Sequence, residues 1–226
     1  MAEMTSGMGI RLLYKAAKNN GVSEDEIKRK TGLTWEFLEN PETQFSIEAL
    51  KSLAELAFEV SGDPALGLHL TRNYRDKPYK LITHIAINAT NMLEAINLWS
   101  QYIELDSDRY QLDVTEENDT FSIRFVNYSS YQADWIQEYY LSFILINCQT
   151  YIDKGIRPIE VCFIHESPEY LSSYRRVFQA PIRFEAPENA IRFQKQDMLR
   201  PLPSANPYLK EVLIKQADTM LSQSGE

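Results

Sequence analysis

The sequence predicts an α+β fold with an N-terminal helical bundle, a small, mainly antiparallel sheet packed against a central buried helix, and a C-terminal linker helix. Apolar side chains recur every three or four residues in the first third of the chain, which is the spacing of helices buried on one face. The spacing changes to two at residues 109–125, as in strands with one buried face. Residues 133–153 are apolar nearly all round, which is typical of a helix buried on all sides.

The composition is that of an ordinary globular protein, since 44% of its 226 residues are hydrophobic and 24% are charged. The net charge of −9 disfavours DNA binding by this chain itself, because phosphate contacts require clustered Lys and Arg. Two cysteines do not make a disulfide framework, and no segment has the apolar length of a signal peptide core or a membrane span. We therefore expect a cytoplasmic protein without a membrane partner.

The helices of the first third are marked by their ends. The apolar pattern of residues 7–19 predicts the first helix, and Ser23, with Glu26 three residues later, forms a capping box that begins the second. Further helices are predicted at residues 35–38, after Ser46 and after Asp63-Pro64, and glycines that predict helix ends follow at Gly21, Gly32 and Gly62.

Residues 14–39 have the layout of a helix-turn-helix pair. The helix that would read bases, Trp35–Glu39, contains Glu36 and Glu39 but no Arg, Lys, Asn or Gln. We therefore interpret this segment as part of a small helical bundle and not as a DNA-binding unit.

The remaining two thirds alternate between helices and strands. Periodicity leaves residues 81–88 open between helix and strand, whereas an amphipathic helix follows a cap at Thr90 or Asn91. The alternation at residues 109–125, interrupted by a polar turn at 116–119, predicts an antiparallel hairpin. The other predicted elements are the central helix at 133–153, a strand at 159–164, a helix at 167–178, short strands at 182–184 and 190–193, and a final helix at 205–222.

No catalytic residue, metal site or cofactor is predicted. The sequence contains no nucleophile elbow, P-loop, dinucleotide-binding glycine pattern or zinc-protease motif, and the three histidines have no Cys or His at ligand spacing. Two alternatives stay open. His84 lies in an apolar run where it could ligate a haem iron of a gas sensor, and Glu166 beside His165 could serve a small hydrolase or isomerase. A hydrogen-bonded histidine and a solvated loop are the simpler interpretations.

Three stretches carry a resemblance to a known family: residues 61–68, 88–102 and 164–203. The last contains, in order, His-x-x-Pro, a helix with Tyr and Phe, Pro-x-x-Phe, Asn-x-x-x-Phe and Leu-Arg-Pro-Leu-Pro. From Gly32 to Leu209 the sequence resembles the N-terminal effector domain, of the arabinose-binding type, of the AraC family of bacterial transcription regulators.

The resemblance implies a ligand-binding and dimerising domain, joined in such regulators to a DNA-binding domain of two helix-turn-helix units that this chain lacks. We expect one effector-binding domain over residues 1–226, made of a helical subregion at 1–78, an α+β subregion at 79–204 and a C-terminal helix at 205–226. The expected partners are a small-molecule effector, a second copy of the chain and, only through the missing domain, DNA. A dimerisation module without a ligand is the remaining alternative.

The effector is expected to bind between the helical region and the sheet and to favour one arrangement of the C-terminal helix. Aromatic residues on the helices and the hairpin are candidates, although core packing also explains them. Arg124 is a cation on the polar face of its strand, and it would require an anion partner if that face were covered. The predicted ligand-binding residues are Trp99, Tyr102, Tyr110, Arg124, Tyr139 and Phe143.

Overall fold

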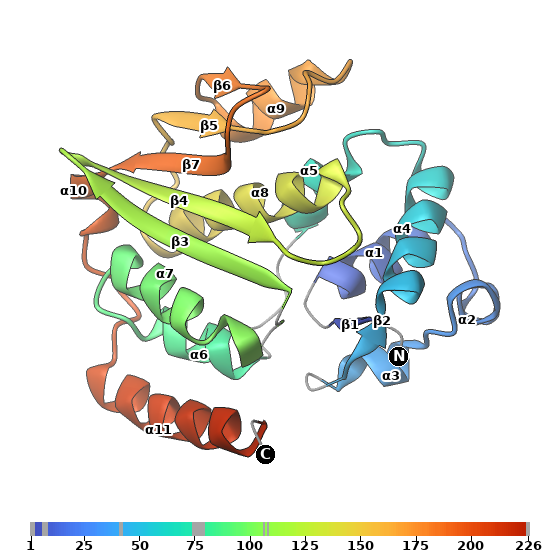
Figure 1. Ribbon diagram of the computed structural model, residues 1–226, viewed down its shortest axis with the longest axis horizontal. Helices are drawn as coiled ribbons and strands as arrows, with labels where there is room; N and C mark the ends of the chain where they lie inside the picture. Colours follow the sequence, from blue (N-terminus) through green and yellow to red (C-terminus); the bar gives the residue numbers. More distant parts are fainter. Residues whose placement is uncertain are drawn as a thin grey trace.

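The computed structural model describes residues 3–5, 9–40, 43–73, 80–105, 107 and 109–224. It confirms the α+β class: helices at the N-terminal end lie beside a small sheet, and further helices cover the sheet (Figure 1). The helices are α1 Gly9–Asn19, α2 Glu24–Thr31, α3 Trp35–Glu39, α4 Ile47–Ser61, α5 Leu66–His69, α6 Leu81–Ile87, α7 Met92–Gln101, α8 Asp134–Tyr151, α9 Leu171–Phe178, α10 Lys195–Met198 and α11 Pro207–Ser224, with 3-10 turns η1 Leu70–Asn73 and η2 Ile103–Leu105.

The main sheet has the strand order β3-β4-β7-β5-β6. Its strands are β3 Tyr110–Glu117, β4 Thr120–Asn127, β5 Glu160–Cys162, β6 Ile182–Arg183 and β7 Asn189–Gln194. All neighbouring pairs are antiparallel except β5 with β6, which run parallel. The predicted hairpin is confirmed, and its alternation buries Phe121, Ile123 and Phe125 on one face and leaves Arg124 exposed on the other.

Several predicted helix ends are confirmed by their caps. The Ser23 and Ser46 hydroxyls accept hydrogen bonds from the backbone N–H groups of Glu26 and Ala49, at 3.2 and 3.1 Å. Gly32 ends α2 with a φ of 74°, in the left-handed region where a side chain would be strained.

Three other segments differ from the prediction or complete it. Residues 81–87 are helical, which resolves the segment whose periodicity allowed either structure. The helix predicted from residue 167 begins only at Leu171, after a turn at 169–170. Asp63 does accept a hydrogen bond from Ala65 N at 3.0 Å, but the helix it introduces is the short α5.

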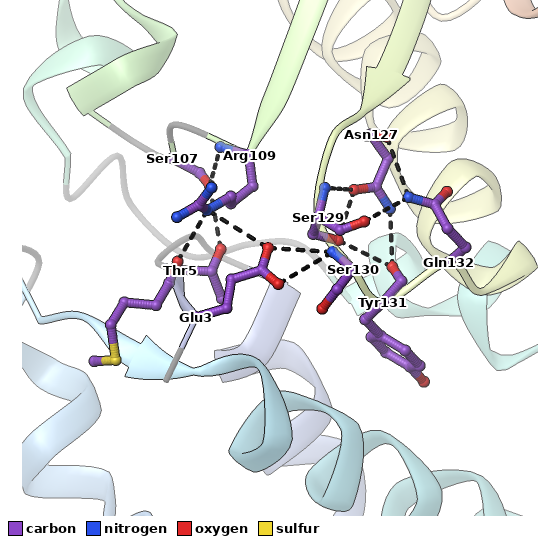
Figure 2. Close-up of polar contacts among 10 residues, drawn as sticks. Glu3, Thr5, Ser107, Arg109, Asn127, Ser129, Ser130, Tyr131 and Gln132 are labelled. Carbon is purple, nitrogen blue, oxygen red and sulfur yellow. Dashed lines mark hydrogen bonds and ion pairs between the residues drawn. The ribbon is translucent and has the colours of Figure 1, made fainter. Parts of the chain in front are cut away.

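Two short strands fasten the N-terminal end to the hairpin. β1 Met4–Thr5 pairs with β2 Phe45–Ser46 just before α4. The Glu3 carboxylate accepts a hydrogen bond from Ser130 N at 3.1 Å and lies 3.7 Å from the Arg109 guanidinium, while the hydroxyls of Thr5 and Ser107 are 3.1 Å apart (Figure 2). The helical bundle is thereby joined to the open end of the β3–β4 hairpin.

The central helix α8 contacts both β4 and β7 of the sheet and packs against α5 and α9. Twelve of its residues are buried, as the apolar sequence predicts. Gly67 allows α5 to lie directly on α8, since a Cβ atom there would come within 2.8 Å of the Trp135 backbone. The close approach explains why a glycine occupies the short helix α5.

A carboxyl group, Glu138, is fully buried in this same helix packing. Its Oε1 accepts hydrogen bonds from the hydroxyls of Tyr170, at 2.8 Å, and Tyr174. Its Oε2 has no hydrogen-bond partner among the described residues. Burial raises the pKa of Glu138 against the opposing effect of the two tyrosine hydrogen bonds, because the charged form is poorly solvated there.

The pH dependence of stability should report this burial. Because the folded-state pKa of Glu138 is raised, its contribution to stability is present below the unfolded pKa, which is close to 4.5, and is lost as the pH rises through the folded value. The variant Glu138→Gln should therefore gain stability relative to the wild type as the pH increases from 4 to 8. Urea unfolding at a series of pH values measures the difference, and a difference that is independent of pH would contradict the prediction.

Candidate functional site

The candidate site is an apolar pocket bounded by α6, α7, β3 and α8. Its empty space, including the open mouth, is about 600 Å³. The lining residues are Thr83, Ala86, Ile87, Met92, Ala95, Ile96, Trp99, Leu112, Tyr140, Phe143, Ile144, Asn147, Tyr151 and Leu202.

Few polar atoms enter this pocket. The Thr83 hydroxyl is buried and has no hydrogen-bond partner among the described residues. Asn147 donates one amide hydrogen bond to Phe143 O at 2.7 Å. Burial raises the pKa of Tyr151, so this phenol stays neutral. An apolar wall with a few convergent polar groups is the usual form of a site for a small organic molecule.

Aromatic rings extend from this pocket into a second, smaller one beneath the N-terminal helices. Trp99 meets Phe143 edge-on at 5.7 Å between ring centroids, and Tyr139 lies 5.8 Å from Phe143 and 5.0 Å from Tyr140. Tyr140 lines both pockets. The second is lined by Gly9, Ile10, Phe45, Leu50, Tyr110, Trp135, Ile136, Tyr139 and Tyr140. The two spaces therefore share a wall of stacked and tilted rings.

The six residues predicted from the sequence fall into three groups. Trp99 and Phe143 line the main pocket, and Tyr110 and Tyr139 line the smaller one. Arg124 lies on the exposed sheet face, where its Nε is 3.1 Å from the Asp113 carboxylate. Its anion partner is thus a neighbouring side chain, as on an open, solvated face.

Tyr102, the sixth residue, contacts the C-terminal helix instead of the pocket. Its hydroxyl donates to the Asp218 carboxylate of α11 at 2.8 Å. Burial, and then the neighbouring Asp218 carboxylate, raise the pKa of Tyr102 to about 12, so the phenol remains a hydrogen-bond donor across the physiological range.

A second polar contact joins the first turn of α7 to the first turn of α11. The Lys210 ammonium lies 2.5 Å from the Glu94 carboxylate, which also accepts a hydrogen bond from Thr90 N at 2.6 Å. Although partial burial opposes it, the hydrogen bonds from Lys210 and Thr90 lower the pKa of Glu94. The two ends of α7 are therefore each tied to α11, and Figure 1 shows α11 lying along α6.

The segment that leads into α11 also contributes to the pocket. Leu202 lines it, and Leu202 N donates to Thr90 O at 2.9 Å. Asn206 N donates to Asn88 O at 3.1 Å, and the Ser204 hydroxyl donates to Ile87 O at 2.6 Å. These hydrogen bonds attach the segment before α11 to the end of α6 and to the turn before α7.

Sequence reasoning missed much of the pocket wall. On α8 it identified Phe143 but not Asn147 or Tyr151, which lie on the same face at helical spacing. That spacing was a usable signal, because Asn147 and Tyr151 place polar atoms on an otherwise apolar face. Thr83 carried no signal, since its segment was ambiguous between helix and strand.

The residues of the alternative functions lie outside this pocket. His84 is exposed on α6, and Glu166 is exposed in the segment before α9. Within the described ranges, no group of three His, Cys, Asp or Glu side chains has the arrangement of a metal site. None of the described helices is both long and apolar enough to span a membrane.

An α+β domain with an apolar pocket is the class that the structure defines, and sequence comparison identifies the family. The family described as the arabinose-binding domain of AraC transcription regulators, N-terminal, matches residues 21–202. The chain belongs to this family.

Two proteins of Pseudomonas aeruginosa illustrate the relationship. The chain is 22% identical over 208 residues to the ornithine utilization regulator, covering 89% of this chain and 60% of that protein. It shares its fold with the crystal structure of the transcriptional regulator CdpR, with a TM-score of 0.60, 15% identity, and coverage of 90% of this chain and 60% of the other. The chain thus spans about three fifths of the length of both relatives.

The contact between α7 and α11 can be tested with Tyr102→Phe. Loss of the hydrogen bond to Asp218 should cost about 1 kcal/mol, so amide hydrogen exchange in α11 should become roughly fivefold faster. Hydrogen–deuterium exchange with mass spectrometry measures this effect. Tyr128→Phe is the matched control, because it removes the hydroxyl bonded to Gln111 on the sheet and should leave α11 unchanged. Equal exchange in the wild type and Tyr102→Phe would contradict the proposed tie.

Proposed function

We propose that this domain senses a small molecule in the pocket between α6, α7, β3 and α8, and that α11 transmits the binding event to a DNA-binding domain. The observation that carries the proposal is the position of the pocket. Its wall includes Leu202, from the segment that leads into α11, and α7, which contacts α11 through Glu94 and through Tyr102, the residue that follows the helix. Membership of a family of regulator domains supports the same function. We propose no catalytic role, and we expect the protein to act in the cytoplasm.

The chemistry of the wall indicates the class of effector. A free sugar has a hydroxyl on most of its carbons, and each would lose its water partner without a replacement in this pocket. Aromatic and aliphatic side chains dominate the lining, and the unpartnered Thr83 hydroxyl offers one polar contact. We therefore expect a compact, mainly apolar or aromatic effector with one or two polar atoms, and not arabinose.

Transmission requires a difference in affinity between two arrangements of α11, since tight binding alone shifts no equilibrium. The two polar ties from α7 are suited to such a shift. Each is worth about 1 kcal/mol, so an effector that breaks or forms both changes the populations by roughly thirtyfold. We propose that residues 1–226 act as one effector-binding unit in this process.

Thermal shift measurements with indole, phenol, 2-phenylethanol, arabinose and ornithine test the proposal. Indole or phenol at ten times its Kd should raise the melting temperature by roughly 3–5 °C, whereas arabinose and ornithine should not. Ala86→Leu places a larger apolar side chain in the pocket and should abolish the shift. Ala205→Leu, at an exposed position outside it, is the matched control. Stabilisation by arabinose, or a shift that survives Ala86→Leu, would contradict the proposed site.

Homodimerisation is also proposed, with α11 as the contact. Three large apolar side chains on this helix face solvent: Tyr208 is 79% exposed, Val212 46% and Leu209 40%. Exposed apolar groups gathered on one surface are typical of interaction sites. A second copy can cover them by pairing the same surface of both chains about a two-fold axis.

Val212→Glu tests this contact, because a carboxylate cannot be buried there without a partner. Light scattering after size exclusion should show a mass of twice 26.2 kDa for the wild type and 26.2 kDa for the variant. Ser222→Glu, ten residues further along α11, is the control and should remain dimeric. A monomeric wild type at 50 μM would exclude this interface.

A further inference from the structure

A separate pocket lies on the opposite side of α8, between that helix, α9 and the α5–η1 segment. Its empty space, including the open mouth, is about 740 Å³. At 100° per residue, Ser142, Leu145 and Gln149 lie on the face of α8 opposite to Phe143, Asn147 and Tyr151. The pocket is lined by Leu68, Thr71, Arg72, Ser142, Leu145, Ile146, Gln149, Arg176, Val177 and Gln179. It shares no lining residue with the effector pocket of the proposed function.

Two exposed arginines, Arg72 on η1 and Arg176 on α9, line this pocket. Within the described ranges neither makes an ion pair or a hydrogen bond with another residue. The chain carries a net charge of −9, and other arginines, such as Arg124, Arg192 and Arg200, do pair with carboxylates. Two arginines that have no carboxylate partner among the described residues can together bind an anion at one hollow, because each guanidinium presents a planar fork of donors.

Further donors lie on the same wall. Among the described residues, the Thr71 hydroxyl makes long contacts of 3.4 Å, to Leu68 O and to the Ser142 hydroxyl, so it can turn toward a ligand at little cost. Gln179 receives the Arg157 guanidinium on its Oε1 at 3.0 Å, which leaves its amide N–H groups as donors.

The floor of the pocket is apolar, because Leu68, Leu145, Ile146 and Val177 line it. An inorganic anion would satisfy the arginines but leave this surface in contact with water. We infer that the pocket binds a small organic acid, whose carboxylate pairs with Arg72 and Arg176 and whose apolar part covers the leucine, isoleucine and valine side chains.

Calorimetric titration of the whole chain with hexanoate and benzoate, at constant ionic strength, tests the inference. Hexanamide, which has the same shape without the charge, and inorganic phosphate serve as comparison ligands. Hexanoate or benzoate should bind, and Arg72→Ala and Arg176→Ala should each weaken that binding at least about tenfold, because a hydrogen-bonded ion pair is lost. Arg175→Ala is the matched control: this arginine is also exposed near the end of α9 but does not line the pocket, so affinity should stay within twofold.

Five results would contradict the inference. Equal binding of hexanamide and hexanoate, or equal losses in Arg175→Ala and Arg176→Ala, would overturn the inference. So would phosphate binding as tight as hexanoate binding, because the apolar floor would then contribute nothing. Lack of binding of both carboxylates at 50 mM would overturn it as well. Loss of hexanoate binding in Trp99→Ala, with the arginine variants unaffected, would place the acid in the other pocket and leave the proposed function intact.

Discussion

The structure depends on one constraint: residues 135–145 of α8 must be buried on every side. A helix with twelve buried residues needs a partner on each face, and the sheet, α5 and α9 supply them. Close packing on one side requires Gly67, because a larger residue would meet the α8 backbone. The same packing removes Glu138 from water and leaves two tyrosine hydroxyls as its partners. Where the surrounding elements do not close completely over α8, they leave the pockets described above.

The fold was largely predictable because its signals are local. The change of apolar spacing from four to two marks where helices give way to the hairpin, and capping at Ser23 and Ser46 fixes where helices begin. Local signals were weaker where tertiary contacts determine the position or type of an element. Ser167-Pro168 has the form of a helix start, yet the chain turns once more, and the helix begins at Leu171. Residues 81–87 satisfy either period, and only packing against α7 and α11 distinguishes the two.

The site was less predictable than the fold, for a physical reason. A core and an apolar pocket are lined by the same residue types. They differ only in whether the packing of several elements leaves a space between the side chains, which no single residue determines. Trp99 and Phe143 line the main pocket, but Tyr102, equally aromatic and on the same stretch of chain, bonds to α11. Arg124 has the charge expected of a ligand contact, yet the register of the hairpin places it opposite Asp113. Which residue lies opposite Arg124 depends on the register between two strands, and the local sequence pattern around Arg124 does not reveal it.

The two pockets lie on opposite faces of α8, which gives this helix a second structural role. α8 contributes Phe143 and Asn147 to one cavity and Leu145 and Gln149 to the other. Because a helix moves as a rigid unit, any rotation or translation of α8 changes the walls of both cavities. Any ligand that prefers one position of α8 therefore changes the affinity of the opposite pocket, and by linkage the effect is reciprocal. Of the two pockets, only the first is lined by α7 and by Leu202 of the segment before α11, whereas α8 lines both. The burial that stabilises the fold is thus also the physical connection between its two cavities.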